Sequence, residues 1–323
     1  MTSRTKKQHF VPRFYLVKFC DPEGFVWTYS GGDEPRGNKA EATAVETNFY
    51  SPIGADGERF DEAEEFLAVI EGNAAPLWGE LCAGKVLKGE KREHVALFLA
   101  AQYLRSPSTV RAGAEMMAMV AHHTSQFIAT DKDFYDQSVD NYEEETGKRI
   151  SRKEREKMRK LLSDSNNFCI NVLRSAGLPV LGTIGDLANI FLNMKWVVGR
   201  SEDQHLITSD SPVTRISDPK THNKVYGDGA FANKTVRVGF PLTPSRVLEL
   251  TWQGEEKERL VEIPKKMARE MNGIRAAQAE RFVYASKSDF GIEKLCRKWL
   301  EPERLNKVVT GINTPSIQVK RKF

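Results

Sequence analysis

The chain opens on the stretch Gln8-His9-Phe10-Val11-Pro12-Arg13-Phe14-Tyr15-Leu16, which places a glutamine and a histidine inside an aromatic-rich run. Buried polar groups need hydrogen-bonding partners, so this opening has to meet polar side chains from elsewhere in the chain. Three later stretches offer them. They contain Glu71, the pair Gln102 and Arg105, and the segment Thr208-Ser209-Asp210-Ser211-Pro212. We therefore expect one polar site, set in a mainly helical protein.

The overall composition is that of a globular protein large enough to bury a core. The chain has 323 residues, of which 40% are hydrophobic and 28% charged. Its formal net charge is +4 and its pI is about 8.7. This balance is compatible with an anionic partner such as nucleic acid but does not require one, because clustering of charge matters more than its sum. Composition gives no indication of an oligomeric state.

The cysteines and the apolar segments indicate in which cellular compartment the protein is expected. Cys20, Cys82, Cys169 and Cys296 are far apart in sequence, so they form neither a C-x-x-C metal pair nor a dense disulfide framework. We expect them to be reduced. The first seven residues carry charge but no apolar core of a secretory signal, and no apolar run approaches the roughly 20 residues of a membrane span. A cytoplasmic protein with no membrane partner is expected.

Helical spacing of apolar residues predicts a block of helices over about residues 59–193. Pro76 is expected to kink or split the first helix, and Ser151 with Glu154 forms a capping box at the start of a later one. The third helix is rich in Ala and Met, as a core helix would be. The predicted helices span residues 59–82, 91–104, 108–130, 151–176 and 182–193.

Strand patterns come at both ends of this block. Tyr15–Cys20 and Phe25–Ser30 flank a Pro- and Gly-containing turn and predict a β-hairpin, and Asn48–Tyr50 is expected to be a short extended piece. Beyond residue 195, aromatic and β-branched runs predict a small, mostly antiparallel sheet. Its strands are expected at 196–199, 205–208, 236–242, 247–252 and 282–285. Two helices, 264–279 and 289–300, are expected among them.

The predicted fold class is therefore α+β. The helical block and the sheet-rich part, about residues 195–300, are expected to form a single domain over residues 1–309. Residues 310–323 end on Lys320-Arg321-Lys322-Phe323, and we expect a basic, mobile tail there.

His9 is the leading candidate for proton transfer, because a neutral imidazole accepts or donates a proton near pH 7. The alternative is a core histidine bonded to backbone carbonyls. Gln8 lies on the opposite side of a strand from His9, and is a candidate for binding substrate. Tyr15 is also placed among the binding candidates, although core packing explains it equally well.

Gln102 and Arg105 are spaced i, i+3, so they share one helix face, which is otherwise apolar. A buried arginine needs an anionic partner, which is either a protein carboxylate or a ligand phosphate. Glu71 and Asp210 are the two carboxylates considered for an internal ion pair. Both interpretations hold if the pair lines a pocket, so Gln102, Arg105 and Glu71 are predicted to bind substrate.

Asp210 is the first choice for a catalytic carboxylate, because it follows a predicted strand and lies in a Ser/Thr-rich turn. It is equally well explained as an Asx turn that begins a loop. Ser209 is a binding candidate. As a nucleophile it would need a base within reach, and the chain has no Gly-x-Ser-x-Gly elbow.

Other features argue against familiar cofactor chemistry. His122 and His123 are adjacent and project about 100° apart on a helix, which does not suit a shared metal. There is no P-loop, no dinucleotide glycine motif and no H-E-x-x-H motif. We expect no cofactor, no nucleotide and no metal ligand set. The basic stretch 148–160 could contact phosphates or could be a solvated helix face.

The motifs resemble a bacterial family of unknown function, numbered forty-two thirty-eight. Its Gln-His-x-x-Pro-x-x-Tyr-Leu-x-x-Phe opening matches Gln8 to Phe19. Its later Asn-Phe-Tyr, Gln-x-x-Arg-Ser/Thr-Pro and Ser-Asp-x-Pro elements match residues 48–50, 102–107 and 209–212. The resemblance covers about residues 6–286.

Some relatives in this family are associated with bacterial defence against phage, including DNA glycosylase activity on modified cytosine. The resemblance therefore implies a nucleic-acid-directed hydrolase acting on phage DNA. Asp210 and His9 would do the chemistry, and Arg105 and the basic stretch would contact phosphates. The chain departs from familiar glycosylases because it has no recognisable helix-hairpin-helix motif. The alternatives are a metal-dependent nuclease or toxin that uses Glu71 and Asp210 as ligands, and a non-catalytic nucleic-acid-binding module.

Overall fold

The computed structural model describes residues 7–51, 61–217, 230–256, 260–300 and 318–320. The chain divides into two compact units. Unit 1 comprises Met1–Val110 and Pro179–Thr310, and unit 2 comprises Arg111–Leu178 and Gly311–Phe323. The predicted helical block therefore contributes to both units, since α5 (Pro107–Thr130) continues from one into the other. The fold class is α+β, as predicted.

Unit 1 contains a five-stranded sheet with the order β11-β6-β10-β9-β8. All neighbours are antiparallel except β11 and β6, which are parallel. β9 is buried over five consecutive residues, whereas β10 has partly exposed residues at Arg246, Glu249 and Thr251. The strands are β6 (Lys195–Arg200), β8 (Thr214–Ile216), β9 (Arg237–Thr243), β10 (Arg246–Thr251) and β11 (Val261–Glu262).

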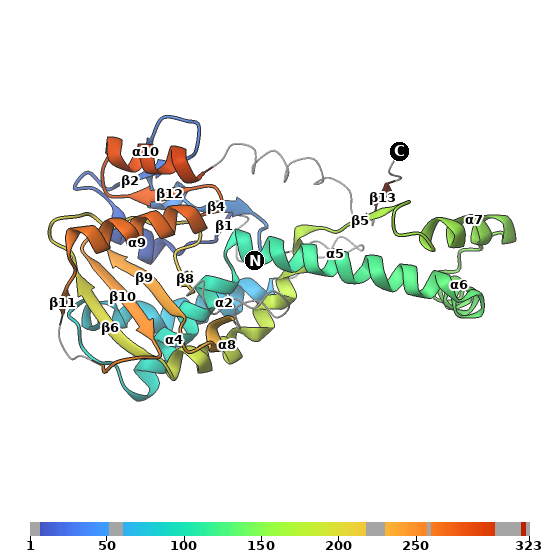
Figure 1. Cartoon of the computed structure of the whole chain (residues 1–323), viewed down its shortest axis with the longest axis horizontal. Coiled ribbons are helices and arrows are strands. Elements are labelled where there is room, and N and C mark those ends of the chain that lie inside the picture. The colour runs from blue at the N-terminus through green and yellow to red at the C-terminus, as the bar shows by residue number, and fades with distance from the viewer. Residues whose placement is uncertain (1–6, 52–60, 218–229, 257–259, 301–317, 321–323) are drawn as a thin grey trace, which may run out of the picture. The chain divides into compact units, whose positions relative to one another are not determined.

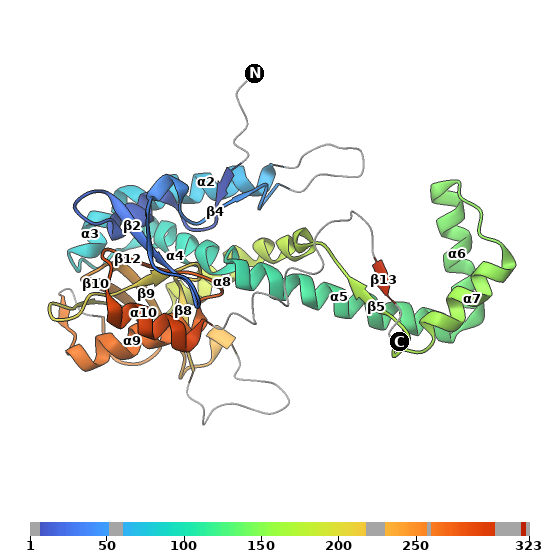
Figure 2. The ribbon, with the colours of Figure 1, turned by 90° about the horizontal axis from the view of Figure 1, so that it is seen from above.

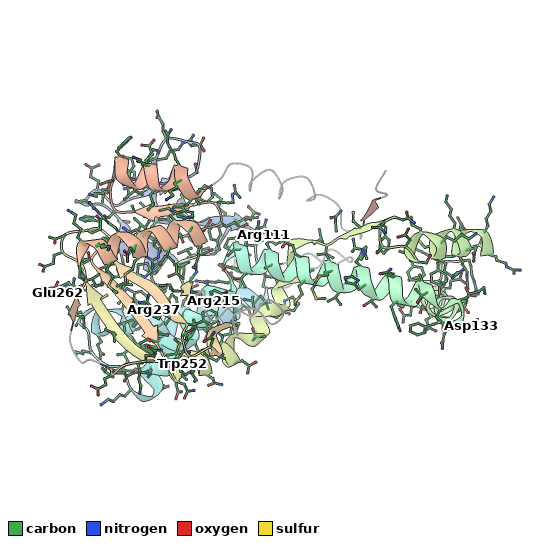
Figure 3. The ribbon with its side chains drawn as sticks, in the orientation of Figure 1. Arg111, Asp133, Arg215, Arg237, Trp252 and Glu262 are labelled. Carbon is green, nitrogen blue, oxygen red and sulfur yellow. The ribbon has the colours of Figure 1, made fainter. Side chains whose placement is uncertain are left out.

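Two ion pairs join neighbouring strands of this sheet, and Figure 3 labels one residue of each, Arg237 and Glu262. Arg237 of β9 lies 3.3 Å from the carboxylate of Glu249 on β10. Glu262 of β11 lies 2.5 Å from the guanidinium of Arg200 on β6. These side chains are partly exposed, so solvent screens the pairs and each contributes little to stability.

Helices cover both faces of the five-stranded sheet. Figures 1 and 2 show α9 (Lys265–Gln278) on one face and α4 (Gly89–Leu104) on the other. The α4 face is aromatic. Phe98 of α4 and Trp78 of α3 (Trp78–Cys82) both contact the ring of Phe240 on β9, with centroid distances of 6.1 and 5.9 Å. Such edge-to-face contacts are favourable beyond the area that they bury.

A second, four-stranded sheet joins the two ends of unit 1. Its order is β3-β2-β12-β7, with every pair antiparallel. The N-terminal β2 lies beside β12, which is more than 250 residues away in sequence. Backbone hydrogen bonds therefore join an early and a late segment of unit 1. The strands are β2 (Phe25–Tyr29), β3 (Arg36–Lys39), β7 (Thr208–Ser209) and β12 (Val283–Ala285), and α10 (Phe290–Trp299) follows the last of them.

The N-terminal hairpin is present but its strands differ from the prediction. Tyr15–Cys20 is not a strand, because residues 13–19 form α1 (Arg13–Leu16) and a 3-10 turn (Val17–Phe19). Pro12 caps this turn, and the helical spacing of Tyr15 and Phe19 buries both rings completely. The hairpin is instead β2 with β3. Asn48–Tyr50 is a turn, since Asn48 has a φ of 53°.

Most helices of unit 1 were predicted correctly. α2 (Glu62–Ala74) ends at a 3-10 turn that contains Pro76, which confirms the predicted split. The 205–208 strand was predicted too long, because only β7 pairs with a neighbour. The N–H of Leu206 donates to Pro244 O, and the N–H of Ile207 donates to the side chain of Asn272. These two N–H groups therefore do not pair with a neighbouring strand of the four-stranded sheet.

Unit 2 is built from helices. It contains the rest of α5, α6 (Lys132–Thr146) and α7 (Arg152–Leu162), with a small core that includes Ala129, Tyr135 and Val139. A short strand, β5 (Cys169–Asn171), pairs with β13 (Gln318–Lys320). The predicted mobile tail otherwise lies outside the described residues.

The helices of unit 2 were predicted only in part. Ser151 and Glu154 form the predicted capping box, but the helix ends at Leu162 rather than near 176. α6 was not predicted, since its polar sequence gives little periodicity and its buried contacts with Ile150 and Leu162 are tertiary. The Met-rich α5 is not a core helix throughout, because Met116, Met117 and Met119 are exposed.

One helical stretch, Arg174–Leu192, is long and apolar enough to cross a membrane by length and composition alone, and 33% of its most apolar part is buried. No such span was expected from the sequence. The second half of the stretch is α8 (Ile184–Leu192), which packs against α4. Arg92 of α4 also donates hydrogen bonds to the carbonyls of Leu192 and Met194. A core helix has these properties as well, so this stretch is weak evidence for a membrane.

Candidate functional site

The opening motif begins in β1 (Lys7–His9), which pairs antiparallel with β4 (Val45–Thr47). The Gln8 side chain is fully buried, and both ends of its amide have partners. Its Oε1 accepts from Tyr50 N at 2.7 Å, and its Nε2 donates to Ser51 Oγ at 2.5 Å. Gln8 therefore secures the turn after β4, and no atom of its amide is left for a substrate.

Arg105 lies at the end of α4 and is almost completely buried, with 2% of its side chain exposed. Its Nη1 lies 2.6 Å from Glu71 Oε1 on α2. Its Nε and Nη2 both donate to Gln102 Oε1, at 3.1 and 2.8 Å. Of the two carboxylates considered for an ion pair, Glu71 is thus the partner. Because 29% of the Glu71 side chain is exposed, the pair connects the buried interior to the solvent.

The same network holds the opening motif. Gln102 Nε2 donates to the carbonyl of Phe10 at 3.0 Å, and Tyr50 OH donates to the carbonyl of Arg105 at 3.0 Å. The Gln102 amide is buried with both ends satisfied. Without these bonds the carbonyls of Phe10 and Arg105 would lose their side-chain donors. The predicted meeting of the opening motif with α2 and α4 is confirmed.

His9 differs from its neighbours because one of its ring nitrogens is unused. Nε2 is buried and has no hydrogen-bond partner. Burial lowers the pKa of His9, and the positive charges of Arg105 and Arg13 act in the same direction. A hydrogen bond with the Ala40 backbone and the negative charge of Glu71 oppose this shift. The imidazole is therefore neutral near pH 7, as a proton acceptor requires.

Tyr15 anchors α1 to both sheets. Its hydroxyl lies 2.7 Å from Thr208 Oγ1 on β7 and donates to Pro241 O on β9, also at 2.7 Å. Its ring packs against Phe240 with a centroid distance of 4.9 Å. Burial raises its pKa well above the usual value. The opening motif thus meets the strand before Ser209–Pro212, and the contacts of Tyr15 are those of a core residue.

Asp210 is buried, with 1% of its surface exposed. Oδ1 accepts from Glu280 N at 2.9 Å, and Oδ2 accepts from Arg281 N and Phe282 N at 2.7 and 2.9 Å. Burial raises the pKa of Asp210 to about 6, although the three N–H donors favour the charged form. These contacts are structural, although they are not the local Asx turn considered from the sequence, because the carboxylate organises the distant loop between α9 and β12.

The serine turn around Asp210 is internal as well. Ser209 Oγ accepts from Ser211 N at 3.1 Å, which is a local turn contact. Ser211 Oγ lies 3.0 Å from Ser108 Oγ, and Ser108 Oγ lies 3.2 Å from Ser106 Oγ. This hydroxyl chain links the turn to the start of α5 and was not predicted. The only feature of the sequence that could have indicated this hydroxyl chain is that Ser106-Pro107-Ser108 follows Arg105 directly.

Two separate groups result. We call His9, Glu71, Gln102 and Arg105 the N-terminal polar cluster; it combines an unused imidazole nitrogen with a partly exposed carboxylate. Asp210 and Ser209 belong to the second group, at the α9–β12 loop. Asp210 has its own backbone partners, and Glu71 is paired with Arg105. The described residues contain no group of three or more His, Cys, Asp or Glu side chains placed to hold a metal ion.

Fold and site define an α+β protein in which buried polar side chains tie the N-terminal segment to a helical core. The chain belongs to the family described as protein of unknown function (DUF4238), whose model matches residues 7–289. The predicted membership of this family is thereby confirmed. No curated protein and no solved structure matches the chain.

Proposed function

We propose that the protein is a nucleic-acid-directed hydrolase in bacterial defence against phage, and most specifically a DNA glycosylase that excises a modified cytosine. The observation that carries the proposal is the unused, buried Nε2 of His9 in a cluster with a partly exposed carboxylate. A neutral imidazole without a partner is available for proton transfer. The other polar side chains around it are already hydrogen-bonded.

The proposed reaction is hydrolysis of the N-glycosidic bond. Water adds to the sugar C1′, the bond to the base breaks, and the base leaves with a proton. Such reactions pass through an oxocarbenium-like state that a carboxylate stabilises. Glu71, held by Arg105 at 2.6 Å, is suited to this role or to orienting the water, and His9 to moving the proton. In this proposal Asp210 positions the α9–β12 loop and does not touch the substrate.

Two further features are compatible with a DNA substrate in the cytoplasm. Arg152, Lys153 and Lys157 are exposed on α7, where they can contact phosphates. Two other arginines of this basic stretch, Arg149 and Arg155, form ion pairs with Glu143, and Arg159 lies near Glu156. All four cysteines are free, as in proteins of reducing compartments. We propose phage DNA as the partner on these grounds.

One observation favours a second candidate, a non-catalytic nucleic-acid-binding module. Gln8, Gln102 and Asp210 use their polar atoms on backbone or side-chain partners inside the protein, as structural residues do. The metal-dependent nuclease has less support, since Glu71 and Asp210 have different partners and do not share a described metal site.

The test uses purified protein in EDTA with two substrates, phage DNA that carries modified cytosines and unmodified DNA. Abasic sites are read as strand breaks that appear only after alkali. We expect breaks on the modified DNA alone. His9→Gln should lower the rate about 100-fold or more, the usual loss when a general acid–base group is removed. Its melting temperature should fall only slightly, because Nε2 makes no hydrogen bond and only the single bond with the Ala40 backbone is affected.

His94→Gln is the matched control. His94 lies near the start of α4, and its contact with Glu90 is a long one of 3.8 Å. This variant should keep full activity. Full activity in His9→Gln would remove His9 from the mechanism. Direct breaks that need an added metal would favour the nuclease, and binding without breaks under either condition would favour the non-catalytic module.

Protonation of His9 predicts a pH dependence of stability. Its pKa in the folded protein lies below the usual 6.5, so the unfolded chain binds the proton first as the pH falls. The stabilising contribution is complete above pH 6.5 and is lost as the pH falls through the folded-state pKa. We expect wild type to lose more stability than His9→Gln between pH 7 and 5 in guanidinium titrations. Equal losses would contradict a depressed pKa.

A further inference from the structure

Arg275 is a second arginine in the core of unit 1. It lies on the buried face of α9 with Ala268, Met271 and Asn272, and only 1% of its surface is exposed. Figure 1 shows this helix lying over the strands of the five-stranded sheet. Among the residues that the structure describes, neither Nε nor Nη1 of Arg275 has an acceptor. A buried guanidinium in this state is unusual, because buried charges are normally paired.

The described surroundings of Arg275 supply no counter-ion. Gly239 of β9 lies beside it, and a Cβ there would be 3.8 Å from Arg275 Nη2 and 2.9 Å from Thr214 Oγ1. Thr214 Oγ1 itself donates to the carbonyl of Gly239. Tyr15 is the electrostatic neighbour of Arg275, but its hydroxyl donates to Pro241 O and is neutral. In the described part of the chain, no carboxylate forms an ion pair with Arg275.

Arg105 provides an internal comparison. Both side chains are almost completely buried, yet Arg105 has Glu71 as its ion-pair partner and Gln102 as a second acceptor. Burial lowers the pKa of Arg275 to about 10, so its guanidinium is still charged at pH 7. The chain has therefore kept a buried positive charge at Arg275 without a described carboxylate to balance it. A bound anion would supply that balance.

We propose that Arg275 anchors a binding site for a small oxyanion, a carboxylate or phosphate group, between α9 and strands β8 and β9. A planar guanidinium suits such groups because its N–H donors match the spacing of their oxygens. Gly239 itself contributes no side chain beside the guanidinium, and the Thr214 hydroxyl fills the space that a Cβ would take. The site is separate from the N-terminal polar cluster, so it does not depend on the proposed hydrolase function.

The test is thermal unfolding of the full chain with sodium phosphate or sodium acetate, with sodium chloride holding the ionic strength constant. A ligand at about 100 times its dissociation constant is expected to raise the melting temperature of wild type by about 5 °C. Arg275→Met should show no such shift. Without added anion this variant should be at least as stable as wild type, since it removes an unpaired buried charge.

Arg269→Met is the matched control, because Arg269 lies on the exposed face of the same helix and contacts Gln204. It should keep the full shift. Arg275→Lys, which keeps the charge, should fold and bind the anion about tenfold more weakly for the loss of a charge-assisted hydrogen bond. A response to one anion only assigns the ligand to that class. Equal shifts in wild type and Arg275→Met, or no shift with either anion, would overturn the proposal.

Discussion

Glu71→Met is expected to lower the free energy of unfolding by about 4 kcal/mol, because it leaves the buried Arg105 guanidinium without its anionic partner. Gln102 would remain as an acceptor but carries no charge. All five tryptophans lie in the segments that form unit 1, so their fluorescence during guanidinium unfolding reports on this unit. The midpoint should move to a lower denaturant concentration with little change in slope.

The control for this prediction is Glu65→Met, on an exposed position of the same helix, which should change stability by about 0.5 kcal/mol at most. The double variant Glu71→Met/Arg105→Met removes both charges together. Its loss should be smaller than the sum of the two single losses, because the pair is coupled. Strict additivity would show that the 2.6 Å ion pair contributes no coupling to stability.

Asp210→Ala is expected to cost about 3 kcal/mol, because it removes the acceptor of three backbone N–H groups at once. The effect should be local as well as global. Amide hydrogen exchange at residues 280–282 should become faster than in wild type, since these N–H groups lose their partner. Asp203→Ala, at an exposed position between β6 and β7, should leave both stability and exchange unchanged.

A competing outcome separates the two roles considered for Asp210. If Asp210→Ala keeps its stability and the protection of residues 280–282 but loses glycosylase activity, the carboxylate acts on the substrate. If stability falls and the remaining folded protein is active, Asp210 is a structural anchor. Its three short backbone contacts favour the second result.

The sequence alone predicted the features that depend on local periodicity and on backbone chemistry. α4, α8, α9 and α10 lie where apolar spacing placed them, and Pro76 interrupts its helix because it has no N–H to donate. The capping box of Ser151 and Glu154 is likewise a contact between near neighbours. The sequence also indicated that a buried Arg105 needs a carboxylate and offered Glu71 as one of two.

Only the tertiary structure decided which contacts form over long distances in sequence. The pattern of residues 15–20 predicted a strand, yet residues 15–19 are helical and Tyr15 reaches Thr208 and Pro241 from this helical turn. The partner of β2 is supplied by β12, and no local pattern identifies a strand more than 250 residues away.

The same reason governs the candidate site. Asp210 and Glu71 look alike in sequence, but one accepts three backbone N–H groups inside a loop and the other faces solvent beside Arg105. Arg275 was missed altogether, since an arginine in a charged helix reads as exposed until its burial is known. Residue types thus determined which polar groups the chain has to satisfy. Packing determined which of them are satisfied, and in the described structure His9 Nε2 and the Nε and Nη1 atoms of Arg275 are among the buried groups without a hydrogen-bond partner.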